Sequence, residues 1–264
     1  MHEFNSVSSD LRAQSKVAGK STRKRRKKGE MHSKILHSNS ETDTLLRSSF
    51  PMFEGITKED AESICSRFVF YRYDKKEYVY LPYDSSEKIY FVQSGNIEIG
   101  YLDESGRELS IDILGRGEIF GTFLGKSFSG GFARAIDSSI VAVLGKRDFE
   151  EFLNKYPQFS YRIFQLMSQR INILQKKLQN LVFSDVRTRI CKLLCSLYEK
   201  AGDQRSGQIK ITLTHQDIAN LVASSRETAS LHLSELKKCG TISYERKRIR
   251  VLSIDTLKSL STCF

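Results

Sequence analysis

The sequence lacks the features from which membrane anchors, secretory signals and disulfide frameworks are built. It contains no run of 18 apolar residues, so we expect no transmembrane helix. No apolar stretch follows the charges near the N-terminus, which argues against a secretory signal. The five cysteines are scattered and odd in number, a pattern typical of a reducing compartment. The composition therefore predicts a cytoplasmic protein that does not bind membranes.

Histidine is absent from residues 48–183, and the histidines elsewhere show neither metal-ligand spacing nor a pairing with a nucleophile. They are His2, His32, His37, His215 and His232. The sequence therefore predicts a protein that is not an enzyme and that has no metal site and no cofactor.

The positive charge of the chain is concentrated at its two ends. The formal net charge is +11, with Lys and Arg exceeding Asp and Glu by five in residues 1–46 and by six in residues 184–264. Residues 47–183 are neutral. This distribution favours a neutral sensor or assembly domain joined to a nucleic-acid-binding domain. Residues 1–46 are expected to form a disordered basic tail that adds salt-sensitive DNA affinity or is dispensable, and Met31 is an alternative candidate for the translation start.

Residues 214–241 have the pattern of two short helices joined by a tight turn. Thr214 is the expected cap of the first helix, and Ser224 is the expected cap of the second, in a capping box with Glu227. A helix whose exposed first turn carries Arg226 and Glu227 can present both side chains to base edges in a major groove. The pattern therefore predicts a helix-turn-helix that reads double-stranded DNA.

The residues after this helix pair are expected to form a small β-hairpin. Residues 242–252 alternate apolar and polar side chains on either side of a basic centre, Arg246-Lys247-Arg248. A helix pair followed by a basic hairpin is typical of a winged helix-turn-helix, in which the wing contacts phosphates.

Short strands broken by glycines are expected between residues 68 and 144, the clearest over 88–93, 96–102, 108–114 and 139–144. Regular strands with such turns predict a small antiparallel barrel or jelly roll. The glycine-rich stretch 115–121 is not a dinucleotide fingerprint, because its spacing is wrong and no βαβ unit surrounds it.

A long helix is expected from Pro157 to about residue 183. Its apolar seam consists of Ile163, Met167, Ile171, Leu174, Leu178 and Leu181. Such a seam predicts pairing with a second copy, and the resulting two-fold axis suits a pseudo-palindromic DNA site. The alternative is packing on the chain's own barrel, and we expect the residues beside the seam to pack there: Phe164, Leu166 and Ile173.

These pieces, taken together, resemble the Crp/Fnr family of transcription regulators over about residues 48–256. The segments that carry the resemblance are 90–95, 103–108, 114–121, 180–189, 208–212 and 225–228. It implies an α+β protein with a cyclic-nucleotide-binding-like barrel or jelly roll, a dimerising helix, and a C-terminal winged helix that docks on promoters beside RNA polymerase. The expected division of the chain is a tail over 1–46, the barrel over 47–156, the helix over 157–183, and the DNA-binding domain over 184–264.

The resemblance also indicates which effectors are absent. Cyclic AMP-responsive members follow the glycine of one motif with a glutamate, whereas Gly121 is followed by Thr122 here. Their phosphate-binding pair aligns near residues 129–130, which carry no cation, and their adenine-reading pair aligns with residues 174–175. The iron–sulfur branch needs N-terminal cysteines and a haem version needs a barrel histidine, and this chain has neither. We therefore expect an effector that is not a cyclic nucleotide, or none.

Two other sensors remain open. Arg134 and Arg170 lie near the arginines with which 2-oxoglutarate-responsive relatives clamp two carboxylates, although both can equally form salt bridges within the chain or between subunits. Cys191 and Cys195 share a helix face, as a thiol switch or as ordinary buried cysteines. The predicted effector-pocket residues are Gly121, Thr122, Arg134, Arg170 and Leu174.

The resemblance assigns roles on the second helix. Arg226 is the expected reader of guanine O6 and N7, and Glu227 the acceptor for a cytosine amine. Leu231 stands where the family carries a third arginine, so it can contact a thymine methyl but cannot donate a hydrogen bond. The remaining predicted DNA contacts are Thr214, His215, Ser224, Ser225, Ser230, Lys247 and Arg248.

Two other classes of protein compete with a promoter-binding regulator. A regulatory subunit of a kinase or channel would need the missing phosphate-binding residues and would have no use for a winged helix. An architectural DNA-binding protein would depend chiefly on its basic tail. The sequence does not distinguish activation from repression.

Overall fold

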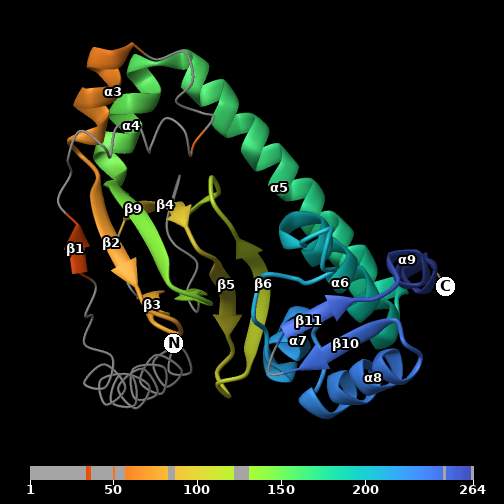
Figure 1. Cartoon of the computed structure of the whole chain (residues 1–264). Coiled ribbons are helices and arrows are strands. Elements are labelled where there is room, and N and C mark those ends of the chain that lie inside the picture. Colours follow the sequence, from red (N-terminus) through yellow and green to blue (C-terminus); the bar gives the residue numbers. More distant parts are fainter. Residues whose placement is uncertain are drawn as a thin grey trace, which may run out of the picture. The chain divides into compact units, whose positions relative to one another are not determined.

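The computed structural model describes residues 34–36, 50, 57–82, 87–121, 131–245 and 248–262 (Figure 1). The chain divides into two compact units, residues 1–33 and 34–264, and every contact below lies within the second. Most of the predicted basic tail lies outside the described residues. Within it, Lys34–Leu36 form strand β1, which pairs with strand β2, so the prediction of a tail without structure up to residue 46 is wrong at this point.

Two antiparallel sheets form the N-terminal part, which we call the sheet domain. One sheet has the strand order β1-β2-β9-β4-β7 and the other β3-β8-β5-β6. The strands are β2 (Val69–Tyr73), β3 (Tyr78–Tyr80), β4 (Lys88–Ser94), β5 (Ile97–Leu102), β6 (Glu108–Leu114), β7 (Ile119–Gly121), β8 (Gly131–Ala135) and β9 (Ser139–Gly145). The predicted fold class is confirmed as a jelly roll, but the two sheets do not close into one barrel.

Apolar residues from alternate positions of both sheets fill the space between them, as expected for strands with one buried face. Tyr90 and Phe120 stack there with their ring centroids 5.0 Å apart. The turn between β4 and β5 requires glycine, because Gly95 has a φ of +80° and a Cβ atom at this position would lie 2.3 Å from Ser139 Oγ. A side chain at this position would therefore clash with the start of β9.

A second, phenylalanine-rich core joins the β2–β9–β4 face to helices α3 (Lys58–Cys65), α4 (Lys146–Lys155) and the start of α5 (Pro157–Phe183). Pro157 occupies the first turn of α5, as predicted. Phe152 of α4 packs edge-on against Phe159 of α5 at 4.2 Å. This core holds the base of the long helix on the sheet domain (Figure 1).

The packing of α5 differs from the expected seam. Ile163 and Met167, predicted to face a second copy, pack on the phenylalanine-rich core, as Leu166 also does. Phe164 and Ile173, expected to pack on the chain's own sheets, are exposed by 69% and 39%. The prediction was wrong at these four positions, because α5 is rotated so that the row containing Ile163 and Met167 faces the sheet domain and Phe164 faces solvent.

The C-terminal part is a winged helix-turn-helix with its own core (Figure 1). Its elements are α6 (Val186–Ala201), α7 (His215–Leu221), α8 (Arg226–Lys238), β10 (Ile242–Glu245), β11 (Arg248–Val251) and α9 (Ile254–Thr262). Strands β10 and β11 pair antiparallel from Ile242–Val251 to Glu245–Arg248, which confirms the predicted hairpin. Within the described part of the chain, no helix is both long enough and apolar enough to cross a membrane.

Candidate nucleic-acid interface

The first helix of the helix-turn-helix, α7, is held by a reciprocal cap. Asp217 donates its backbone N–H to Thr214 Oγ1 at 3.1 Å, and Thr214 donates its backbone N–H to Asp217 Oδ2 at 2.7 Å. Both bonds satisfy amides that the first turn leaves free. The predicted cap at Thr214 is confirmed, and its partner is Asp217.

The recognition helix α8 begins one residue later than its predicted cap implied. Ser225, not Ser224, is the N-cap and accepts a hydrogen bond from the backbone N–H of Thr228 at 3.1 Å. The turn before it passes through Ala223 at φ +50°, the left-handed region that residues with a Cβ atom rarely adopt. This turn sets the register, so the capping box predicted for Ser224 and Glu227 does not form.

The first turn of α8 is open to solvent. Arg226 and Glu227 are both exposed, and Leu231, one turn further along, is exposed by 58%. Hydrogen bonds from backbone and from Ser225 hold the pKa of Glu227 below its ordinary value, so this carboxylate is charged at neutral pH. A guanidinium and a carboxylate thus project from one uncovered helix end, the geometry that base reading requires.

His215 links α7 to α8. Its Nδ1 atom lies 2.7 Å from Ser230 Oγ, and its ring packs against Tyr244 of the wing with centroids 4.7 Å apart. Tyr244 in turn donates its hydroxyl to the Leu213 carbonyl at 3.0 Å. His215 therefore lies beside the first turn of α8, in an open hollow that it lines with Arg226.

One of the predicted wing cations, Arg248 on β11, is exposed. Arg250 on the same strand, which the sequence analysis did not single out, is exposed as well. The predicted tip residues Arg246 and Lys247 lie outside the described residues.

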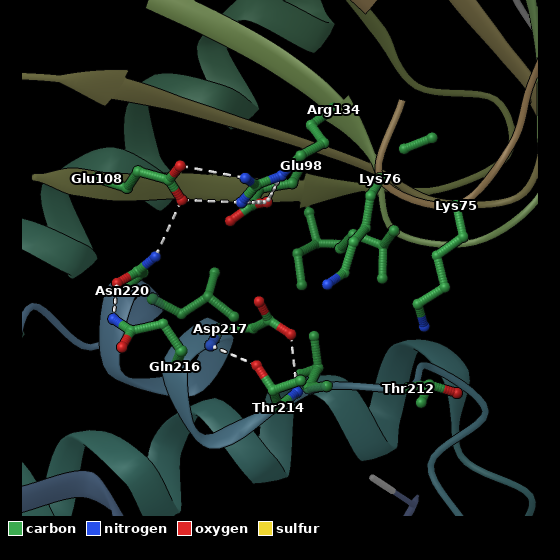
Figure 2. Close-up of a pocket in the computed structure, with 15 residues that line it drawn as sticks. Lys75, Lys76, Glu98, Glu108, Arg134, Thr212, Thr214, Gln216, Asp217 and Asn220 are labelled. Atoms are coloured by element: carbon green, nitrogen blue, oxygen red, sulfur yellow. Dashed lines mark hydrogen bonds and ion pairs between the residues drawn. The ribbon is translucent and has the colours of Figure 1, made fainter. Parts of the chain in front are cut away.

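Arg134, a predicted effector ligand, already holds two carboxylates. Its Nη2 atom lies 2.7 Å from Glu98 Oε2 and 2.9 Å from Glu108 Oε2, and Nη1 donates to the Tyr78 hydroxyl at 3.2 Å. Burial by itself would lower the pKa of Arg134, but Glu108 and Glu98 raise it above the ordinary value. Figure 2 shows this cluster facing a cavity of about 250 Å³ that α7 closes from the other side.

Arg170 on α5 pairs with a different carboxylate, with Nη2 3.8 Å from Asp112 Oδ2. Lys177, about two turns further along α5, donates to the Ile111 carbonyl. The arginines therefore form intrachain ion pairs, the alternative to a dicarboxylate clamp. A clamp would require both to leave these partners.

The chain matches two family models, a cyclic nucleotide-binding domain over residues 71–156 and a Crp-like helix-turn-helix domain over residues 188–260. It is 29% identical over 170 residues to the CRP-like cAMP-activated global transcriptional regulator of Mycobacterium tuberculosis (strain ATCC 25618 / H37Rv), covering 62% of this chain and 75% of the relative. It is 27% identical over 177 residues to the anaerobic regulatory protein of Bacillus subtilis (strain 168), covering 65% and 74%. This chain belongs to the Crp/Fnr family.

Solved structures of similar fold include FixK2 from Bradyrhizobium japonicum, with a TM-score of 0.67, 19% identity, and coverage of 74% of this chain and 98% of that one. A CooA mutant from Carboxydothermus hydrogenoformans has a TM-score of 0.66 and 22% identity, covering 87% and 98%. At these identities the likeness concerns the fold. This Crp/Fnr protein is a transcription regulator with a DNA-binding helix-turn-helix.

The other predicted effector residues are not gathered with Arg134. Gly121 ends β7 beside Ile89 of β4, and Leu174 is exposed by 41% on α5. Thr122 lies outside the described residues.

The two cysteines of α6 are in a poor environment for a thiol switch. Cys191 and Cys195 are buried in the core of the winged helix. Burial raises the pKa of Cys191 to about 11, and it raises the pKa of Cys195 as well. A thiolate is the reactive form, so this environment suits structural cysteines.

Sequence reasoning missed Glu108, Asn220 and Tyr244. Tyr244 is a wing residue that packs on the ring of His215, and the alternation that predicts the hairpin does not indicate this contact. Glu108 and Asn220 are 112 positions apart, and no local pattern connects them.

Proposed function

We propose that this Crp/Fnr protein is a homodimeric, sequence-specific regulator that places Arg226 and Glu227 of each subunit into the major groove of a pseudo-palindromic promoter site. The observation that carries the proposal is the capped and solvent-exposed first turn of α8 beside a basic wing. Arg226 reads guanine with a bidentate bond, and Glu227 accepts from cytosine. Leu231 contacts a thymine methyl and supplies no donor at the third position.

Dimerisation rests on an exposed apolar stripe along α5 from Phe164 to Leu181. Its members recur at spacings of seven, three, four and three: Phe164, Ile171, Leu174, Leu178 and Leu181. This heptad-like stripe suits a parallel pair of long helices, and water-exposed apolar area of this extent is unusual on a monomer. The pair of helices sets the spacing of the two recognition helices on the duplex.

The effector of the sheet domain is not a cyclic nucleotide. The positions that relatives use for the cyclic phosphate carry no cation, and stacked Tyr90 and Phe120 occupy the space between the sheets. An effector-independent regulator is consistent with this packing. The alternative is a small dicarboxylate such as 2-oxoglutarate, which Arg134 and Arg170 could hold only after leaving their intrachain carboxylate partners. The buried, high-pKa cysteines give less support to a thiol switch.

The protein acts without catalysis, in the cytoplasm, and docks beside RNA polymerase at its promoters. This part of the proposal rests on the names of its relatives, one a global transcriptional regulator and the other an anaerobic regulatory protein.

The decisive experiment selects duplexes from a random pool with the full chain and then tests Arg226→Ala on the selected duplex. The wild type is expected to enrich a two-fold-symmetric site. Arg226→Ala is expected to lose about 100-fold or more in affinity for that site, because each lost bidentate contact costs about 1–3 kcal/mol and the dimer has two. Weak, salt-sensitive binding should remain.

Lys238→Ala provides the matched control, since it removes one exposed cation from the other end of the same helix. It should keep the footprint and lose less than about fivefold. A protected palindrome that survives Arg226→Ala, or a wild type that enriches no site, contradicts the proposal.

A further inference from the structure

One hydrogen-bonded path crosses from the sheet domain to the helix-turn-helix. Glu108 Oε2 on β6 accepts from Arg134 Nη2 at 2.9 Å and from Asn220 Nδ2 on α7 at 3.3 Å. Asn220 is 8% exposed, and its Oδ1 accepts from Gln216 Nε2 at 2.8 Å, so its amide is oriented toward Glu108. Figure 2 shows the four side chains as a continuous chain along one wall of the cavity.

Apolar packing lies beneath this path. Ile113 of β6 and Ile136, just after β8, are 6% and 9% exposed and belong to the same buried cluster as the core of the winged helix. Helix α7 therefore rests on β6 through a small apolar contact with one charged hydrogen bond above it. Apolar contact is non-directional, so the bond from Asn220 to Glu108 supplies the orientation.

The charge on Glu108 is held in place from the sheet side. Arg134 forms an ion pair with Glu98, which is 4% exposed and also accepts a hydrogen bond from the Ser110 hydroxyl. Arg134 cannot rotate without breaking its ion pair with Glu98. Its hydrogen bonds to Glu108 therefore fix that carboxylate, and Glu108 Oε2 stays directed toward α7 as an acceptor. The sheet domain thus offers a preorganised acceptor, and α7 supplies the donor.

The contact leaves the reading helix free. Asn220 lies on the face of α7 that meets β6, whereas Arg226 and Glu227 are exposed in the same arrangement. The junction therefore orients the helix-turn-helix without covering the residues that read bases. A contact of this kind favours DNA binding. When both helix-turn-helix domains of the dimer are already oriented, less conformational entropy is lost on binding the duplex.

We infer that Glu108 and Asn220 are positioning residues that couple the sheet domain to the recognition helix and thereby raise DNA affinity. The inference rests on the proposed DNA-binding function and deepens it. An anion that draws Arg134 away from Glu108 would also weaken the hydrogen bond from Asn220 to Glu108. This hydrogen bond therefore connects the ion pairs of Arg134 in the sheet domain with the helix-turn-helix.

The test exchanges the roles of donor and acceptor in the full chain, using the duplex selected by the wild type. Asn220→Asp places a carboxylate against Glu108, and the affinity is expected to fall by about tenfold or more. Combining Asn220→Asp with Glu108→Gln puts the carboxamide on the sheet and the carboxylate on the helix, and should restore the affinity to within about threefold. Thr212→Val, which changes another lining residue of the cavity, is the control and should bind within about twofold.

A distance measurement separates positioning from general weakening. Spin labels at the exposed Cys239 and at Glu104→Cys, in a Cys263→Ser background, report how firmly the helix-turn-helix is held against the β5–β6 turn. The distance distribution should be narrow in the wild type, broad in Asn220→Asp, and narrow again in the double variant.

Unchanged affinity and distance in Asn220→Asp, tighter DNA binding, or no rescue by the double variant would overturn the inference. If circular dichroism shows that Asn220→Asp is unfolded, Asn220→Ala replaces it, with an expected loss of about three- to tenfold; wild-type affinity and distances in Asn220→Ala then overturn the inference. A wild type that selects no duplex rejects the proposed function, and the distance measurement still decides whether the coupling exists.

Discussion

The Nδ1 atom of His215 lies 2.7 Å from Ser230 Oγ, and this contact ties the start of α7 to the middle of the recognition helix. The other ring nitrogen, Nε2, is buried and has no hydrogen-bond partner among the described residues. A proton on the ring is therefore unfavourable, and the pKa of His215 is lowered by burial and by the charge of Arg226. The ring also faces Tyr244, whose pKa is raised by burial and then by the charge of Asp217 on α7.

This arrangement predicts a pH-dependent contribution to stability. The unfolded chain binds the His215 proton with the ordinary pKa of about 6.5, and the folded chain binds it only at lower pH. The stability contributed by the neutral ring is complete above about pH 6.5 and is lost as the pH falls through the folded pKa. His215→Gln should remove this component, so the difference in unfolding free energy between wild type and variant should shrink from pH 7.5 to pH 5. Urea titrations at several pH values measure it, and a constant difference would contradict the prediction.

Leu178→Glu is expected to dissociate the dimer. Leu178 is 62% exposed in the single chain, so the substitution costs nothing in the core but places two carboxylates at the predicted helix pair. Loss of a buried leucine in each subunit, at about 1.5–3 kcal/mol each, should weaken dimerisation by about 100-fold or more. Sedimentation equilibrium measures it. Gln179→Glu adds the same charge one residue off the stripe and should leave the dimer intact.

The two caps of the helix-turn-helix can be told apart by alanine substitution. Thr214→Ala and Ser225→Ala each remove a side-chain acceptor for a backbone amide, and each should lower the unfolding free energy by about 1 kcal/mol. Ser224→Ala removes no cap and should have less effect than either. Equal losses at Ser224 and Ser225, measured by urea unfolding, would place the start of α8 one residue earlier.

Arg134→Met should be among the more destabilising substitutions in the sheet domain. It leaves Glu98 buried without its cation, which costs about 3–5 kcal/mol for a buried pair. Arg107→Met breaks an exposed pair with Asp103 in the β5–β6 turn and should have no measurable effect on thermal unfolding. If both variants unfold at the wild-type temperature, the Arg134 cluster has no structural role.

Local patterns predict most of the elements correctly. The alternation over residues 88–144 predicts the strands, Pro157 predicts the start of α5, and the hairpin after α8 follows from apolar alternation about a basic centre. These features depend on interactions within a few residues, such as capping and turn geometry. The exposure of Arg226 and Glu227 is predicted for the same reason, since a capped helix exposes its first turn.

The errors occur where distant segments meet. The apolar row of α5 was assigned to the wrong partner at Ile163 and Phe164, because either row satisfies a helical period and only the phenylalanine-rich core decides which is buried. The sequence left Arg134 open as an effector ligand or as a member of an ion pair. Its partners come from β5 and β6, and their approach depends on sheet register.

By itself, the sequence determined the type of most elements, the charged and exposed first turn of α8, and the family, because these depend on short-range periodicity and on residue chemistry. Only the tertiary structure decided which face of α5 is free, which carboxylates hold Arg134, and that Glu108 reaches Asn220. Those contacts join residues up to 112 positions apart, and they form only when sheet register and helix rotation bring the side chains within hydrogen-bonding distance.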